Sequence, residues 1–144
     1  MANNQLELVA EWEQQKEQKC IQAFQHAQQY AQDNKTKLSG LEQYRREYLQ
    51  QAHNKASLGL AAQTYGQHQS FIGKLDKACE QQSKVIDNAV LVADQRRMEW
   101  LQQQRKRKAV DMLLDKKRQK MQKRENRLEQ QLLDEMSLQK FLRG

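Results

Sequence analysis

The sequence predicts an all-α fold of two long helices that form an antiparallel coiled-coil hairpin, with the second helix longer than the first. Composition is the first reason, because only 38% of the residues are hydrophobic and the mean hydropathy is -1.09. Such a polar chain suits long helices that each bury one narrow stripe. The second reason is that proline is absent while good helix formers such as Gln, Lys, Leu and Glu dominate. The third is an apolar repeat of about 3.5 residues, the period of a coiled coil.

The first helix is expected at about residues 4–56. Asn4 and Glu7 have the spacing of a capping box, which favours a helix start at this point. An apolar stripe then runs along the helix and should face the second helix. Its expected members are Leu6, Val9, Trp12, Cys20, Phe24, Ala27, Ala31, Leu38, Leu41, Tyr44 or Arg45, Tyr48 and Ala52.

The chain is expected to reverse direction at a tip of about residues 57–68. The apolar repeat breaks there, and both Gly59 and Gly66 fall within the segment. Thr64 and Gln67 have the spacing of a second capping box, which indicates a new helix start. A short helical turn that closes the tip is expected from four apolar residues, Leu58, Leu60, Ala61 and Ala62.

The second helix is expected at about residues 69–140. Its stripe should consist of Phe71, Leu75, Ala78, Gln82, Val85, Ala89, Val92, Arg96, Trp100, Val110, Leu113, Leu114, Met121, Leu128 and Leu132. A reversal near residue 62 places Tyr48 opposite about residue 76 and leaves roughly the last 25 residues beyond the first helix. We therefore expect residues 1–144 to form a single helical hairpin.

The net charge of +7 belongs to the second half of the chain. Residues 73–144 hold 18 basic and 11 acidic side chains, and the basic ones are concentrated in residues 105–127. This asymmetry indicates an acidic protein surface, nucleic acid or anionic lipid as a partner, without choosing among them. No segment has the roughly 20 apolar residues that span a bilayer, and no secretory signal is visible at the N-terminus. We therefore expect the protein in the cytoplasm.

The sequence lacks the patterns of an enzyme. It has no glycine-rich phosphate loop, no nucleophile motif and no histidine–carboxylate metal spacing. Cys20 and Cys79 also lack the close spacing of a zinc or redox motif, and we expect them to be small buried residues. We therefore expect no catalytic residue, no metal and no cofactor. A partner-binding surface is expected instead where aromatic side chains gather near the tip, namely Tyr44, Tyr48 and Phe71 together with Leu75.

Three motifs, in the same order along the chain, resemble those of the FliJ family of flagellar export proteins. The first is Leu41-Glu-Gln-Tyr44-Arg-Arg-Glu-Tyr48, and the second is Phe71-Ile72-Gly-Lys-Leu75-Asp-Lys-Ala78. The third follows Trp100 and a basic run, and consists of Arg127-Leu-Glu129-Gln130 with Asp134-Glu135. Gln131 replaces the usual lysine of this ending, which puts one charged contact in doubt. Gly73 and Cys79 also depart from the pattern, but only in packing.

The resemblance implies a non-enzymatic component of the bacterial flagellar type III export apparatus, similar to the central stalk of rotary ATPases. It implies binding to the hexameric ring of the export ATPase FliI through Arg127, Glu129, Gln130, Asp134 and Glu135, with residues 5–20 of the open end also entering the ring. It also implies binding to the cytoplasmic domain of the export-gate protein FlhA through Leu41, Tyr44, Tyr48, Phe71, Leu75, Ala78 and Gln82. Such a protein couples the ATPase to export and serves as an export chaperone that meets other chaperones. It would be a monomer in the cytoplasm, peripheral to the inner membrane at the flagellar base.

Three other interpretations remain open. The first is the equivalent stalk protein of a virulence type III secretion system, a group that shares the hairpin but not the motif of Leu41, Tyr44 and Tyr48. A basic coiled coil that binds nucleic acid is the second, although Asp111, Asp115 and Glu125 interrupt the basic run. No aromatic residue beyond Trp100 accompanies that run to provide a stacking platform, so no nucleic acid is expected as a partner. The third is a structural homodimer.

Overall fold

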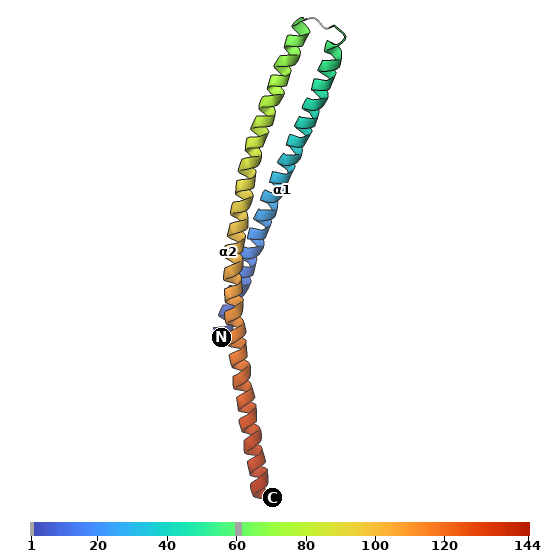
Figure 1. The fold of residues 1–144 in the computed structure, drawn as a ribbon. Coiled ribbons are helices and arrows are strands. Elements are labelled where there is room, and N and C mark those ends of the chain that lie inside the picture. Colours follow the sequence, from blue (N-terminus) through green and yellow to red (C-terminus); the bar gives the residue numbers. More distant parts are fainter. Residues whose placement is uncertain (1, 60–61) are drawn as a thin grey trace. The chain divides into compact units, whose positions relative to one another are not determined.

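The computed structural model describes residues 2–59 and 62–144, which form two α-helices (Figure 1). Helix α1 spans Ala2–Ala56 and helix α2 spans Ala62–Arg143. The helices pack against each other as an antiparallel hairpin, and the second helix is the longer one, which confirms the predicted fold class. The expected turn at the tip includes Leu60 and Ala61, which lie outside the described residues.

Both helices begin earlier than the capping patterns indicate. Helix α1 starts at Ala2, so that Asn4 lies inside it, and α2 starts at Ala62, so that Gly66 is a helical residue. The early start of α2 places Tyr65 and His68 beside one small pocket together with side chains near the end of α1. A glycine inside a helix costs only about 1 kcal/mol relative to alanine, and such packing can offset that cost.

Helix α1 ends in a short turn whose last described residue is a glycine. The amides of Ser57, Leu58 and Gly59 donate to the carbonyl oxygens of His53, Lys55 and Ala56, at 3.0, 3.1 and 3.1 Å respectively. Gly59 has φ +85°, a left-handed conformation that side chains with a Cβ rarely adopt. The chain therefore leaves the helix at a point where only glycine fits without strain.

The contacts of the chain gather in two compact units. One unit holds Met1–Lys19 and Leu101–Gly144, and the other holds Cys20–Trp100. We call the first the open-end unit, because it contains both ends of the chain, and the second the tip unit, because it contains the reversal. Each unit has its own interhelical seam, and the two seams differ in chemistry.

The seam of the tip unit is made of small apolar residues and aromatic rings. Ala31, Leu75 and Ala89 are buried in it. The rings of Phe24 and Trp100 pack across it with 5.8 Å between their centroids. The predicted stripe is correct for these five residues, and helices with alanine at the contact can approach closely enough to bury them.

The seam of the open-end unit is largely polar instead, and here the predicted stripe is correct for Leu114 but wrong for Val9, Trp12 and Leu113. Val9 and Trp12 are 40% and 58% exposed, and Leu113 is 57% exposed. The buried positions are Ala10, Glu13, Glu17, Gln103 and Leu114. The helical phase explains the difference, because steps of three and four residues back from Cys20 reach Glu17, Glu13 and Ala10. A continuous helix keeps that phase even where it brings carboxylates into the seam.

The last part of α2 has no partner helix. Every residue from 118 to 144 is exposed, and within the open-end unit this part continues beyond the start of α1 (Figure 1). We call residues 119–144 the overhang. Met121, Leu128 and Leu132, which were predicted to lie on the stripe, are 45%, 57% and 60% exposed. Leu128 and Leu132 lie farther along α2 than Arg118, which pairs with Glu7 near the start of α1.

Candidate functional site

The aromatic residues that the sequence singled out lie together in the tip unit. The ring centroids of Tyr48 and Phe71 are 4.6 Å apart, and those of Tyr44 and Phe71 are 6.3 Å apart in an edge-to-face arrangement. Both geometries are favourable for aromatic pairs. Phe71 of α2 therefore holds two tyrosines of α1. We call this group, with its neighbours on the two helices, the tip cluster: Leu41, Tyr44, Tyr48, Phe71, Leu75, Ala78 and Gln82.

The members of the tip cluster differ in exposure. Leu75 is buried, and Tyr44 is 49% exposed. The other five are half-buried, namely Leu41, Tyr48, Phe71, Ala78 and Gln82. Two helices alone cannot cover this many rings, so part of an aromatic surface remains open to water. Aromatic surface that is held rigid by its neighbours is favourable for protein recognition, because little conformational entropy is lost on binding.

The pairing within the tip cluster differs from the predicted level. Tyr48 contacts Phe71 and its hydroxyl hydrogen-bonds to Nδ1 of His68, whereas residue 76 was expected opposite it. Asp76 instead accepts from Nε of Arg45 at 2.5 Å. The reason is the early start of α2 at Ala62, which shortens the connection and shifts the facing residues toward the tip.

Two residues of this region were not singled out by the sequence. Asn34 is buried, and its carbonyl and side-chain oxygens accept from Nε2 of Gln82 at 2.9 and 2.8 Å. His68 supports Tyr48 through the hydrogen bond between the two side chains. Asn34 carries a signal that was available, because it occupies a stripe position three residues after Ala31. His68 carries none, since its place depended on where α2 begins.

The five residues expected to contact an ATPase ring all lie on the overhang. Arg127, Glu129, Gln130, Asp134 and Glu135 are exposed, and Nε2 of Gln130 donates to Asp134 at 3.2 Å along the same helix. The structure thus presents them on one unsupported helix. No fixed arrangement beyond the helix itself orients them.

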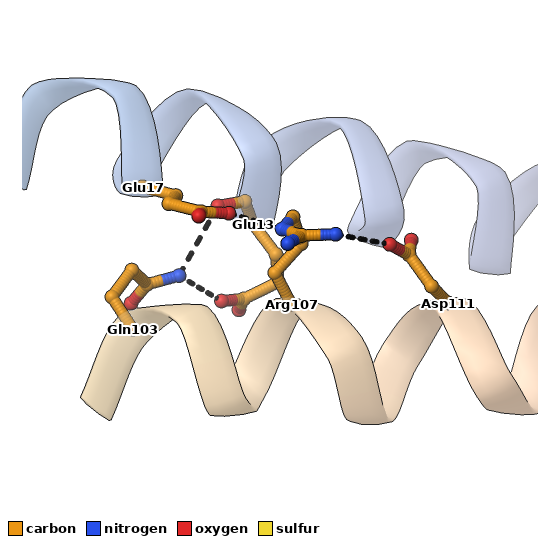
Figure 2. A network of polar contacts seen from close by, with 5 residues as sticks. All are labelled: Glu13, Glu17, Gln103, Arg107 and Asp111. Atoms are coloured by element: carbon orange, nitrogen blue, oxygen red, sulfur yellow. Dashed lines mark hydrogen bonds and ion pairs between the residues drawn. The ribbon is translucent and has the colours of Figure 1, made fainter. Parts of the chain in front are cut away.

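A polar network that the sequence did not predict closes the open-end unit (Figure 2). Nε of Arg107 donates to the carboxylate of Glu17, and Nη1 of Arg107 donates to Asp111 at 2.9 Å. These two hydrogen bonds raise the pKa of Arg107, with Glu17 making the larger contribution. The guanidinium of Arg107 therefore links α2 to α1 through Glu17 and also forms a hydrogen bond within α2, to Asp111.

The second part of the network is a buried amide–carboxylate pair. Nε2 of Gln103 donates to the backbone oxygen of Glu13 at 3.1 Å and to the side-chain carboxylate of the same residue. The hydrogen bond from Gln103 lowers the pKa of Glu13, and the neighbouring charges of Lys16 and Lys106 act in the same direction. A buried polar layer of this kind specifies the register of two helices, because any slip would leave its groups unpaired.

Other kinds of site are not indicated by the described residues. No group of three or more His, Cys, Asp or Glu side chains within them is placed to hold a metal ion. In that part of the chain, neither helix contains a stretch long and apolar enough to cross a membrane. Cys20 and Cys79 are free thiols, and both are half-buried rather than buried as expected.

A two-helix hairpin with an aromatic cluster in one unit and a long exposed segment of single helix in the other defines a coiled-coil protein. A family model described as flagellar FliJ protein matches residues 1–144, the whole chain. The chain therefore belongs to the FliJ family, which confirms the resemblance of its motifs. It is a component of the flagellar type III export apparatus, and the family is non-enzymatic. The searches among curated proteins and among solved structures found no match.

Proposed function

We propose that this protein bridges two parts of the export apparatus. The tip cluster binds the cytoplasmic domain of the export-gate protein FlhA, and the overhang binds the ring of the export ATPase FliI. The observation that carries the proposal is the exposed, ring-supported Tyr44 within the tip cluster. Family membership over the whole chain supports the two partners.

The proposed mechanism is conformational bias rather than chemistry. A binding protein changes the activity of a partner only by binding one of its states more tightly than another. Bound to the ring, the overhang would favour one state of the ATPase, and the tip cluster would favour one state of the gate. The protein would then couple ATP hydrolysis to export, serve export chaperones, and act in the cytoplasm at the inner face of the membrane.

A binding assay with the gate domain tests the tip half of the proposal. Tyr44→Ala should weaken binding of the gate domain on the order of 10-fold or more, as expected for an aromatic anchor. Tyr30→Ala is the matched control, because Tyr30 is a similarly exposed tyrosine (58%) of α1 in the same unit. If the two variants bind the gate domain equally well, the tip cluster is not the gate surface.

A pull-down and ATPase assay tests the overhang half. The whole chain should bind the export ATPase and stimulate hydrolysis, whereas a chain truncated after Arg124 should do neither. A full-length variant with Asp134→Lys and Glu135→Lys should lose binding as well, because these carboxylates are exposed on the overhang. A variant with Glu80→Lys and Asp87→Lys, two exposed residues of the tip unit, is the charge-matched control and should bind normally. Retained stimulation by the truncated chain would contradict the proposal.

A further inference from the structure

The exposed apolar residues of the open-end unit point to a surface that neither half of the proposed function uses. Glu7 pairs with Arg118 at 3.4 Å, and Glu17 pairs with Arg107. Trp12 is midway between the two glutamates in sequence, and Leu113 is midway between the two arginines. The two residues therefore lie at the same level of the hairpin, and they are 58% and 57% exposed.

They also lie on the same side of the seam. The opposite side is a shallow groove lined by Glu7, Glu11, Gln14, Lys108, Asp111 and Asp115. On both helices, residues spaced three and four apart share a face. This spacing relates Trp12 to Val9 and Lys16 on α1, and Leu113 to Val110 and Lys117 on α2, away from the groove residues.

The ammonium group of Lys16 lies 3.4 Å from the carboxylate of the seam residue Glu13. Lys16 of α1 and Lys106 of α2 both act on the carboxylate of Glu13, which lies in the seam. The ammonium group of Lys16 sits 3.5 Å from the centroid of the Trp12 ring. We define the Trp12 face as Val9, Trp12, Lys16, Lys106, Leu113 and Lys117. It carries three lysines and no acidic residue, whereas the groove on the other side holds four carboxylates together with Lys108 and Arg118.

We propose that the Trp12 face is the docking site of an acidic amphipathic helix from a partner protein. Its anchors follow steps of three, four and seven residues, the spacing with which a third helix meets a groove between two helices. An exposed tryptophan beside a leucine is the kind of anchor that dominates binding energy. The lysine rim selects acidic flanks on the docking helix, and the carboxylate side of the hairpin repels them.

The inference extends the proposed function at its open end, but it is tested without the ATPase or the gate. The probe is a dye-labelled peptide with leucine at the a and d positions of its heptads and glutamate at e and g. Mutual repulsion of the glutamates keeps this peptide from pairing with itself at neutral pH. The control peptide carries lysine in place of glutamate. Fluorescence anisotropy with the full-length chain reports binding.

Neighbouring residues on the other faces provide matched controls. Trp12→Ala and Leu113→Asp should each weaken binding of the glutamate peptide on the order of 10-fold or more. Gln14→Ala and Met112→Asp, both on the groove side, should leave it within about 2-fold, although Met112 is 62% exposed. Lys106→Glu should weaken binding and Arg105→Glu should not.

Each outcome decides the inference. Binding of the glutamate peptide that depends on Trp12, Leu113 and Lys106 supports it. Equal binding of the lysine peptide, or equal losses in the control variants, overturns it. The inference is also overturned if the chain does not bind the peptide but binds single-stranded RNA through the same lysines, with an affinity that falls steeply with salt. Because all six substitutions are at exposed positions or on the rim, unchanged helical circular dichroism should accompany each result.

Discussion

The tip unit and the open-end unit are built from the same two helices, yet different forces hold them together. Aromatic rings and buried Ala31, Leu75 and Ala89 form most of the seam of the tip unit, which contains one buried polar pair, that of Asn34 and Gln82. The seam of the open-end unit consists largely of a polar network around Arg107 and Gln103. The stability that comes from buried apolar side chains does not depend on their charge. The stability of a polar seam depends on every hydrogen-bond partner being present and in the correct charge state. The tip unit therefore contributes more to the stability of the fold. The polar network of the open-end unit fixes the register of the two helices and makes this unit sensitive to the charge of its side chains.

Truncation of one buried leucine in each unit should give the largest difference between the units in the free energy of unfolding. Leu75→Ala should lower the free energy of unfolding by about 2–3 kcal/mol, because a cavity is left among rings and helices that cannot collapse fully. Leu114→Ala should lower it by roughly 1 kcal/mol less, since its polar surroundings admit water. Urea unfolding followed by circular dichroism measures both values. A larger loss for Leu114→Ala would break the comparison.

Loss of the arginine should reveal the polar character of the open-end unit. Arg107→Met should destabilise that unit by about 1–2 kcal/mol, because Glu17 is left largely buried without its partner. Hydrogen exchange measured by mass spectrometry should show faster exchange in residues 2–19 than in the tip unit. A double variant, Arg107→Met with Glu17→Leu, should recover most of the protection. If it does not, the ion pair is a true source of stability rather than a requirement for pairing.

The backbone at the end of α1 should contribute independently of either seam. Gly59→Ala should cost about 1 kcal/mol or slightly more, because a Cβ strains the left-handed conformation. Gly40→Ala, inside α1 with open space around its Cα, should instead stabilise the protein by about 0.5–1 kcal/mol. Thermal unfolding of the two variants gives the signs. Equal signs would show that the turn at Gly59 is not fixed in solution.

The smallest effect should be a pH dependence confined to the open-end unit. Glu13 has a pKa below its ordinary value of about 4.5, mainly because Gln103 donates to its carboxylate. Its contribution is therefore present above about pH 4.5 and is lost as the pH falls through the folded-state pKa. Gln103→Leu should remove this dependence. Exchange in residues 2–19 at several acidic pH values provides the measurement, and a matching change in the tip unit would contradict it.

The sequence predicted the fold class and the tip cluster because both rest on apolar spacing, which packing obeys. It placed Tyr44, Tyr48 and Phe71 together correctly, but it assigned Tyr48 the wrong partner level. Helix α2 starts at Ala62, two residues before the pattern of Thr64 and Gln67, and no local pattern reports this start. In the open-end unit the search for bulky residues chose Val9 and Trp12 over Glu13 and Glu17. Helical phase was the better guide there, because a rigid helix carries its inward face through unfavourable residues.

The overhang has a thermodynamic consequence of its own. A lone helix in water is a helix–coil equilibrium, since nucleation is unfavourable and each added residue contributes little. Residues 119–144 are exposed throughout and are supported by side-chain bonds four residues apart, such as that from Gln122 to Asn126. The segment, ~40 Å long at about 1.5 Å per residue, should lose helicity from its free end upon warming. The mean helical length of the overhang therefore depends on temperature. A partner that binds the overhang also stabilises its helical form.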